Sequence, residues 1–171
     1  MSNWVYKVFL LTFLLSIIFS AVINLMVRDA NVLIILILIV AVMLVAFLFD
    51  VIATSALTSE EASFHAKNAK KVKGAKEAIW VIKNQVKVVS ICSDVIGDIL
   101  GIASGALGAV LAINLSQNAN FNLTITSIIV AAVISAFTVG GKALFKEYAV
   151  KKSDRITFRF GKVIYFFKFK K

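Results

Sequence analysis

Residues 32–49, "VLIILILIVAVMLVAFLF", decide the fold of this chain, because eighteen consecutive positions carry no polar side chain. A helix needs about 20 predominantly apolar residues, with a range of about 17–25, to cross the hydrocarbon of a bilayer. A helix that is apolar on every side lies in a large core or in a membrane. The stretch therefore predicts a membrane-spanning helix.

The composition of the whole chain agrees with that prediction. Apolar residues make up 60% of the 171 residues, proline is absent, and the mean hydropathy is +0.93. A soluble domain has about 45–50% apolar residues even with glycine included. We predict an all-α, polytopic membrane protein. Its transmembrane domain covers residues 1–155, with four spans at about 8–27, 32–54, 88–113 and 123–145.

Charge is distributed unevenly over the segments that flank these spans. Residues 59–87 hold seven lysines, residues 142–171 hold ten basic residues, and residues 114–122 hold no charge. A tight link at residues 27–31 contains Arg28 and Asp29. Because Lys and Arg concentrate in cytoplasmic loops, we expect a multi-pass protein of the bacterial cytoplasmic (inner) membrane with both termini in the cytoplasm. The first span is then a retained anchor rather than a cleaved signal peptide.

Two basic segments lie on the predicted cytoplasmic side. Residues 60–82 place apolar residues at steps of three and four with lysines between them, which predicts one amphipathic helix. Residues 156–171, "ITFRFGKVIYFFKFKK", alternate basic and aromatic residues and are expected to form a membrane-proximal tail, as a short strand or an interfacial anchor. Membrane lipids are the expected partners of both segments. Nucleic acid is not expected, since the positive-inside rule already explains the lysines.

The third span contains two carboxylates. Asp94 and Asp98 are four residues apart and share one helix face, with Ser90 one turn earlier. A charged group in a membrane helix costs about 2.5–3.5 kcal/mol on insertion scales, so it tends to face a bundle interior or an aqueous cavity. The neighbouring glycines, Gly97 and Gly101, either allow close helix packing or expose backbone carbonyls to an ion.

The second span ends with a further group of oxygen atoms, on Asp50, Thr54 and Ser55. Hard cations such as Mg²⁺ take oxygen ligands. We do not expect a zinc site, because such sites use several Cys and His ligands and the whole chain has one cysteine and one histidine. We therefore predict a Mg²⁺ site whose candidate ligands are Asp94, Asp98, Ser55, Thr54, Asp50, Gly97, Gly101 and Ser90.

Lysines near these acids support other interpretations of the same residues. Asp50 can cap the cytoplasmic end of its span near Lys83 or Lys87. Lys142, at the end of the fourth span, either snorkels to the cytoplasm or neutralises one of the aspartates. In the second case Lys142 modulates the charge of the site and the acids are structural.

Three segments resemble the transmembrane domain of the CorB/CorC and cyclin-M family of magnesium and cobalt transporters. Residues 53–84 are similar to that family's first core span and the basic helical hairpin after it, residues 88–106 to its next span, and residues 140–156 to the end of its last span. The resemblance covers about residues 33–156 and does not include the family's CBS pair. It implies a homodimer whose Mg²⁺ site would use Ser55, Ser59, Asp94 and Asp98. Lys142 stands where the family has a glutamate.

The expected function is divalent-cation (Mg²⁺ or Co²⁺) transport or efflux by such a homodimer. A non-transporting scaffold or regulatory protein is the alternative. It would bind lipids or a partner through the basic helix and tail, with Asp94 and Asp98 paired to Lys142 or Lys87. A proton-coupled relay through the same acids is a third hypothesis. We expect no enzyme, since no nucleophile–base pair is visible.

Overall fold

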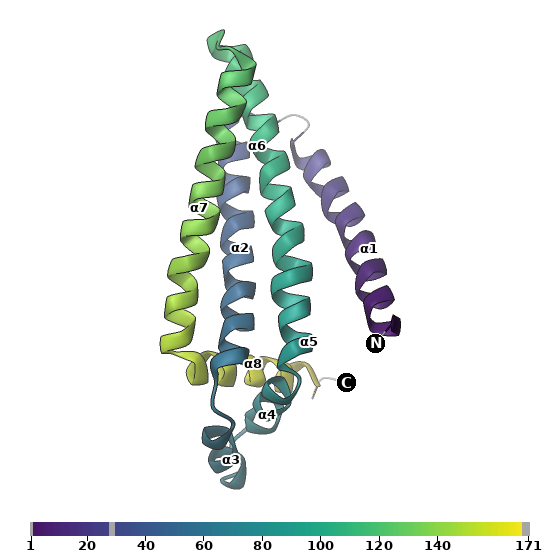
Figure 1. Ribbon diagram of the computed structural model, residues 1–171, viewed down its shortest axis with the longest axis vertical. Helices are drawn as coiled ribbons and strands as arrows, with labels where there is room; N and C mark the ends of the chain where they lie inside the picture. The colour runs from purple at the N-terminus through teal and green to yellow at the C-terminus, as the bar shows by residue number, and fades with distance from the viewer. Residues whose placement is uncertain (1, 28–29, 169–171) are drawn as a thin grey trace. The chain divides into compact units, whose positions relative to one another are not determined.

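A computed structural model describes residues 2–27 and 30–168 of the chain. Every regular element in these ranges is a helix (Figure 1). In chain order the elements are α1 (Ser2–Val27), α2 (Val32–Thr58), α3 (Glu61–Ala69), α4 (Ala75–Lys83), α5 (Gln85–Val89), η1 (Ser90–Gly97), α6 (Asp98–Ala119), α7 (Leu123–Lys151) and α8 (Ser153–Lys168). The Arg28–Asp29 pair of the predicted link, and residues 169–171 of the predicted tail, lie outside the described residues.

Within the described ranges, four helical stretches are long and apolar enough to cross a membrane. They are Trp4–Val27, Val32–Thr58, Gln85–Ala119 and Leu123–Lys151, and the third combines α5, η1 and α6. The predictions of an all-helical chain and of four such helices are confirmed. Each helix extends beyond the predicted span at one end or both. The apolar run marks only the part of a helix that suits hydrocarbon, and no proline interrupts the backbone.

The chain divides into two compact units. Unit 1 comprises Met1–Phe47 and Val95–Lys142, and unit 2 comprises Leu48–Asp94 and Ala143–Lys171. Three elements, α2, η1 and α7, continue from one unit into the other. Unit 2 carries nearly all the charged side chains of the described residues.

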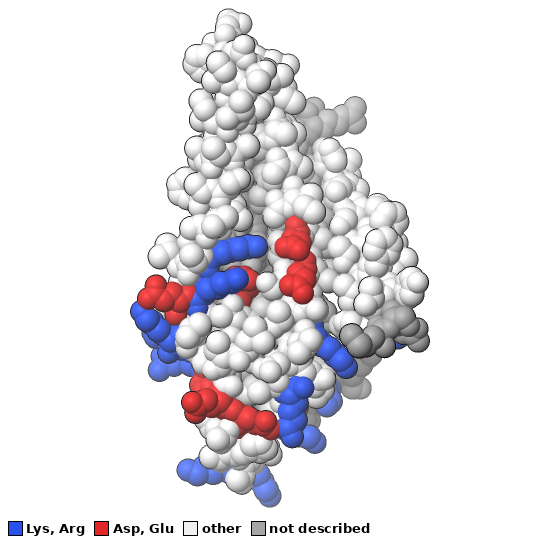
Figure 2. Space-filling view, viewed as in Figure 1, with Lys and Arg blue, Asp and Glu red and all other residues white. Residues whose placement is uncertain are grey.

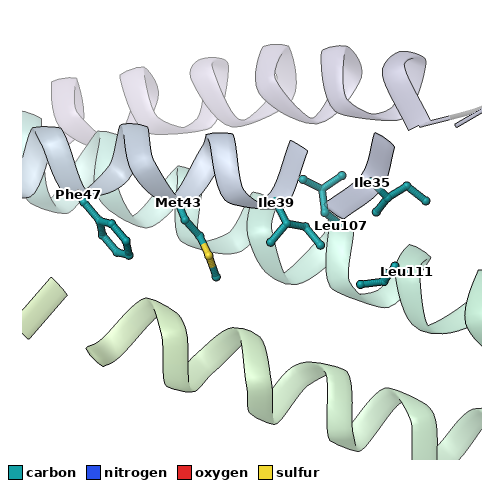
Figure 3. Close-up of a cluster of buried hydrophobic side chains, with 6 residues drawn as sticks. All are labelled: Ile35, Ile39, Met43, Phe47, Leu107 and Leu111. Carbon is teal, nitrogen blue, oxygen red and sulfur yellow. The ribbon is translucent and has the colours of Figure 1, made fainter. Parts of the chain in front are cut away.

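Unit 1 has a core formed by α2 and α6 (Figure 3). The buried residues of this core are Ile35, Ile39, Met43 and Phe47, spaced four apart on α2, with Leu107 and Leu111 of α6. Spacing by four keeps side chains on one face of a helix. Two glycines allow close contacts in this unit. A methyl group at Gly108 of α6 would strike Ile134 of α7, and one at Gly141 of α7 would strike the ring of Phe47.

In unit 2, α8 lies crosswise to the end of α2 (Figure 1) and is joined to the residues that follow α2 by hydrogen bonds. The hydroxyl of Ser59 donates to the hydroxyl of Thr157 at 2.8 Å. The carboxylate of Asp154 accepts a hydrogen bond from the backbone N–H of Glu60 at 3.1 Å and another from the hydroxyl of Ser63 at 2.7 Å. These bonds join residues more than ninety positions apart.

Packing of α8 against α4 completes unit 2. Gly161 of α8 is the closest point, because a methyl group there would come within 2.7 Å of the Gly74 carbonyl oxygen and 2.8 Å of the Ala78 nitrogen. The buried apolar residues form two clusters. One contains Ala53, Ala56, Val81, Val88 and Cys92, and the other contains Phe64, Ala78, Ile79 and Ile82.

The single amphipathic helix predicted for residues 60–82 is wrong. The chain forms two helices, α3 and α4, because Lys71 and Gly74 have positive φ angles of 53° and 87° and break the helix between them. The apolar periodicity is real. However, the apolar residues lie on the faces of two short helices instead of one long helix, and these faces pack against each other and against Phe158 of α8.

The strand that the tail pattern allowed is also wrong, because residues 153–168 form the helix α8. Phe160 and Ile164, one turn apart, pack on the cluster that contains Ala53 and Val81. The apolar residues of this helix therefore divide, with Phe160 and Ile164 turned to the core of unit 2 and Phe166 and Phe167 exposed.

Candidate functional site

Asp50 is the most buried acid of the predicted site. It lies near the C-terminal end of α2 and is only 2% exposed. Its Oδ1 accepts a hydrogen bond from the hydroxyl of Ser93 at 2.8 Å, and the ammonium of Lys146 lies 3.6 Å from Oδ2. No described residue donates a hydrogen bond to Oδ2. A buried carboxylate of this kind is stable only with a charged or hydrogen-bonding partner, and Asp50 has one of each.

The lysine that pairs with Asp50 was not among the expected ones. Sequence reasoning pointed to Lys83 or Lys87 for this role and to Lys142 as the modulating charge. Lys146 lies one helical turn after Lys142, and half of its side chain is exposed. The spacing alone does not decide between these two lysines. Lys146 belongs to unit 2 together with Asp50, whereas Lys142 belongs to unit 1.

The hydroxyl groups near the C-terminal end of α2 differ in their hydrogen bonding. Ser55 is fully buried, and its Oγ has no hydrogen-bond partner among the described residues. Its backbone carbonyl accepts the hydroxyl of Ser59, and that of Thr54 accepts the hydroxyl of Thr58. At about 3.6 residues per turn, Asp50 and Ser55 are about 140° apart around α2. The two buried oxygens without hydrogen bonds therefore point to different sides of the helix.

Asp94 and Asp98 are both exposed, and they lie on either side of a change in helix type. Asp94 belongs to the π-helix η1, which begins at Ser90 and ends at Gly97, and Asp98 is the first residue of α6. In a π-helix each carbonyl accepts a hydrogen bond from the N–H five residues later. Such helices are rare, and those that occur are often found at functional sites. The sequence gives no signal for it. We infer that η1 sets the direction of Asp94 by a wider turn than an α-helix would.

The remaining predicted residues are placed as follows. Gly97 is buried, and Gly101 has open space where a side chain would begin. Lys142 is half-buried. Both Lys142 and Asp98 are described residues of unit 1, and they form no ion pair with each other. The pairing of Lys142 with Asp98 that sequence reasoning allowed is therefore not observed.

No group of three or more His, Cys, Asp and Glu side chains in the described part of the chain is arranged to hold a metal ion. Among the residues that the structure describes, a site made mainly of carboxylates is thus not present in one copy of the chain. The predicted Mg²⁺ site, which combines one or two carboxylates with hydroxyl and carbonyl oxygens, stays a prediction.

Basic side chains gather on unit 2, where Figure 2 shows blue and red patches beside a largely uncharged surface. Some of the lysines are held by aromatic rings. Lys67 lies 4.8 Å from the ring centre of Phe64 and 4.9 Å from that of Phe158, distances typical of cation–π contacts. At the surface of α3, a hydrogen bond of 2.9 Å between His65 and the Glu61 carboxylate lowers the pKa of the Glu61 carboxyl. The positive charge of Lys83, 3.4 Å from the same carboxylate, lowers this pKa further.

Comparison of the chain with family models, curated proteins and solved structures finds no match. Its class is therefore defined by the fold, as an all-helical protein with four helices long and apolar enough to cross a membrane.

Proposed function

We propose that the chain is an integral membrane protein and that its four long apolar helices cross the bilayer. Unit 2 holds most of the lysines and arginines, on α3, α4, α8 and the end of α7. This charge supports a cytoplasmic position for unit 2 and for both termini, in a bacterial cytoplasmic membrane.

Within that membrane we propose that the protein transports a divalent cation, Mg²⁺ or Co²⁺, as a homodimer. The observation that carries this proposal is that Asp94 and Asp98 are exposed carboxylates in a stretch, Gln85–Ala119, that is otherwise apolar over most of its length. An acid that faces lipid is costly, so each needs a cation, water or a second subunit to cover it. A divalent cation satisfies two carboxylates at once.

The small number of acidic groups favours transport over storage of the ion. Conduction requires binding that is favourable enough for entry and weak enough for release. Asp94 and Asp98 would attract the ion, and hydroxyl oxygens such as that of Ser90 would replace part of its water shell. The proposal involves no chemical transformation of a substrate.

Flux into liposomes tests this proposal. Purified protein is reconstituted with a Mg²⁺-sensitive dye inside, and the wild type is compared with Asp94→Asn/Asp98→Asn. A control double variant, Glu60→Gln/Glu77→Gln, removes two acids outside the long apolar helices. We expect flux in the wild type and the control and a loss of at least about tenfold in the aspartate variant. Equal flux in all three proteins, or none in the wild type, contradicts transport.

A non-transporting membrane scaffold is the second candidate, and the Asp50–Lys146 pair favours it. A buried acid that already has a lysine at 3.6 Å and a serine hydroxyl at 2.8 Å is well suited to fix helix packing. In this case the wild type gives no flux. Asp50→Asn then lowers thermal stability, while binding to liposomes with anionic lipids depends on the lysines of α3, α4 and α8.

A further inference from the structure

A basic hollow of about 610 Å³ lies in unit 2, between the turn that joins α3 to α4 and the C-terminal end of α8. Its charged and aromatic lining consists of Lys71, Lys73, Lys76, Lys168, Glu77 and Tyr165. Four lysines and one acidic residue therefore line the hollow. None of the four lysines forms an ion pair with a described residue, whereas Lys67 and Lys162 lie over aromatic rings.

The backbone at this hollow is held in place by close packing. Gly74 has a φ of 87° and a methyl group added there would come within 2.9 Å of the backbone of Lys162. The N–H of Ala75 donates to the carbonyl of Val72 at 3.1 Å. The lysines on either side of Gly74 therefore start from a fixed turn, which reduces the entropy lost when they converge on one ligand.

The start of α4 adds to the positive potential of the hollow. No side chain caps the N-terminus of this nine-residue helix, whose first turn holds Lys76 and the acidic residue Glu77. Unpaired N–H groups and the helix dipole favour an anion at such an end. The lysines and the helix terminus thus point to the same kind of ligand, a compact group with more than one negative charge.

We propose that this hollow binds a phosphate monoester group, with Lys71, Lys73, Lys76 and Lys168 around its oxygens and the hydroxyl of Tyr165 as a further donor. Lysine binds phosphate as a point charge. The group can belong to a lipid headgroup or to a free phosphate. The exposed rings of Phe166 and Phe167, next to Tyr165, favour the lipid, because aromatic residues prefer the headgroup level.

Only the lipid source rests on the proposed membrane location. Binding in detergent micelles therefore tests the hollow separately from transport or scaffolding. Full-length protein is incubated with equal amounts of phosphatidate, phosphatidylglycerol and phosphatidylcholine, and the retained lipids are measured by native mass spectrometry. Inorganic phosphate is then added as a soluble competitor.

Two triple variants carry the test, since each removes three positive charges. Lys71→Gln/Lys73→Gln/Lys76→Gln changes the hollow, and Lys70→Gln/Lys151→Gln/Lys152→Gln changes basic residues outside it. We expect the wild type and the second triple variant to retain phosphatidate over phosphatidylglycerol. The hollow variant should retain at least about tenfold less phosphatidate. If the hollow triple variant fails to fold, the single variant Lys73→Glu, at an exposed position, replaces it.

Each outcome decides the proposal. Phosphatidate that resists millimolar phosphate identifies a lipid site. Phosphate that binds alone with the same lysine dependence, and displaces the lipid, identifies a free-phosphate site. Equal losses in both triple variants, or retention of phosphatidylglycerol at the level of phosphatidate, show general attraction of anions and overturn the proposal.

Discussion

Gly161 on α8 offers the sharpest test of how unit 2 is built, because unit 2 positions both the basic hollow and the pair that holds Asp50. A methyl group at this position would lie 2.7 Å from the Gly74 carbonyl oxygen, 2.8 Å from the Ala78 nitrogen and 2.9 Å from the Ala78 Cβ. Two of these atoms belong to the backbone and the third cannot rotate. Gly161→Ala therefore forces α8 away from α4.

Two opposing effects set the size of the change. Extra methyl groups in a packed core cost about 1–3 kcal/mol. Alanine in place of glycine in a helix interior gains about 0.8–1.0 kcal/mol. Gly140→Ala is the matched control, because Gly140 lies inside α7 and no atom is within 4 Å of its added methyl group. The free energy of unfolding should therefore be about 1–3 kcal/mol lower for Gly161→Ala than for Gly140→Ala.

Thermal unfolding in detergent, followed by circular dichroism, measures this difference. Limited trypsin digestion locates it, since a loosened α8 should speed cleavage at the lysines of α3 and α4 in Gly161→Ala alone. Equal stabilities for the two variants, with wild-type trypsin patterns, would refute the packing of α8 on α4 as described here.

Three further changes have defined outcomes. Ser93→Ala removes a hydrogen bond to the carboxylate of Asp50 and should lower the free energy of unfolding by about 1.5–3 kcal/mol in thermal scans; an unchanged melting temperature would contradict that bond. His65→Ala should raise the pKa of the Glu61 carboxyl toward 4.5 in an NMR titration. A carboxyl whose pKa is lower in the folded than in the unfolded state stabilises the fold at pH values above its unfolded-state pKa, and this stabilisation is lost as the pH falls. The variant lacks part of it and should therefore lose less stability in acid. Asn120 has a φ of 54°, so Asn120→Val should cost about 1–2 kcal/mol while Asn120→Gly is tolerated.

The long apolar helices were predictable because their signal is local. Residues 32–49 need only their own side chains to prefer a helix in hydrocarbon, and α2 forms as expected. The break between α3 and α4 was not predictable in this way. Lysine has no strong preference for the positive φ that Lys71 adopts. Gly74, at the same break, packs against Gly161, a residue 87 positions later that no local pattern connects to it.

The candidate site was predictable in part for the same reason. The composition of the spans singles out Asp50, Asp94 and Asp98, because acids are rare among apolar residues. The partners of Asp50 required the fold. Ser93 and Lys146 are separated from Asp50 by 43 and 96 residues, and no local pattern connects them. The π-helix η1 likewise has no composition that distinguishes it from the α-helices around it.

The bond between Ser59 and Thr157 has a consequence for how the chain is made. The two hydroxyls are 98 residues apart, and ribosomes add about 5–20 residues per second. The bond therefore cannot form until about 5–20 s after Ser59 is synthesised, and the apolar face of α4 that α8 later covers is without its partner for most of that interval. During that interval Ala78 and Ile79 are available to chaperones or to another nascent chain. Early shielding of this face, rather than the final stability of unit 2, would then decide how much protein folds correctly.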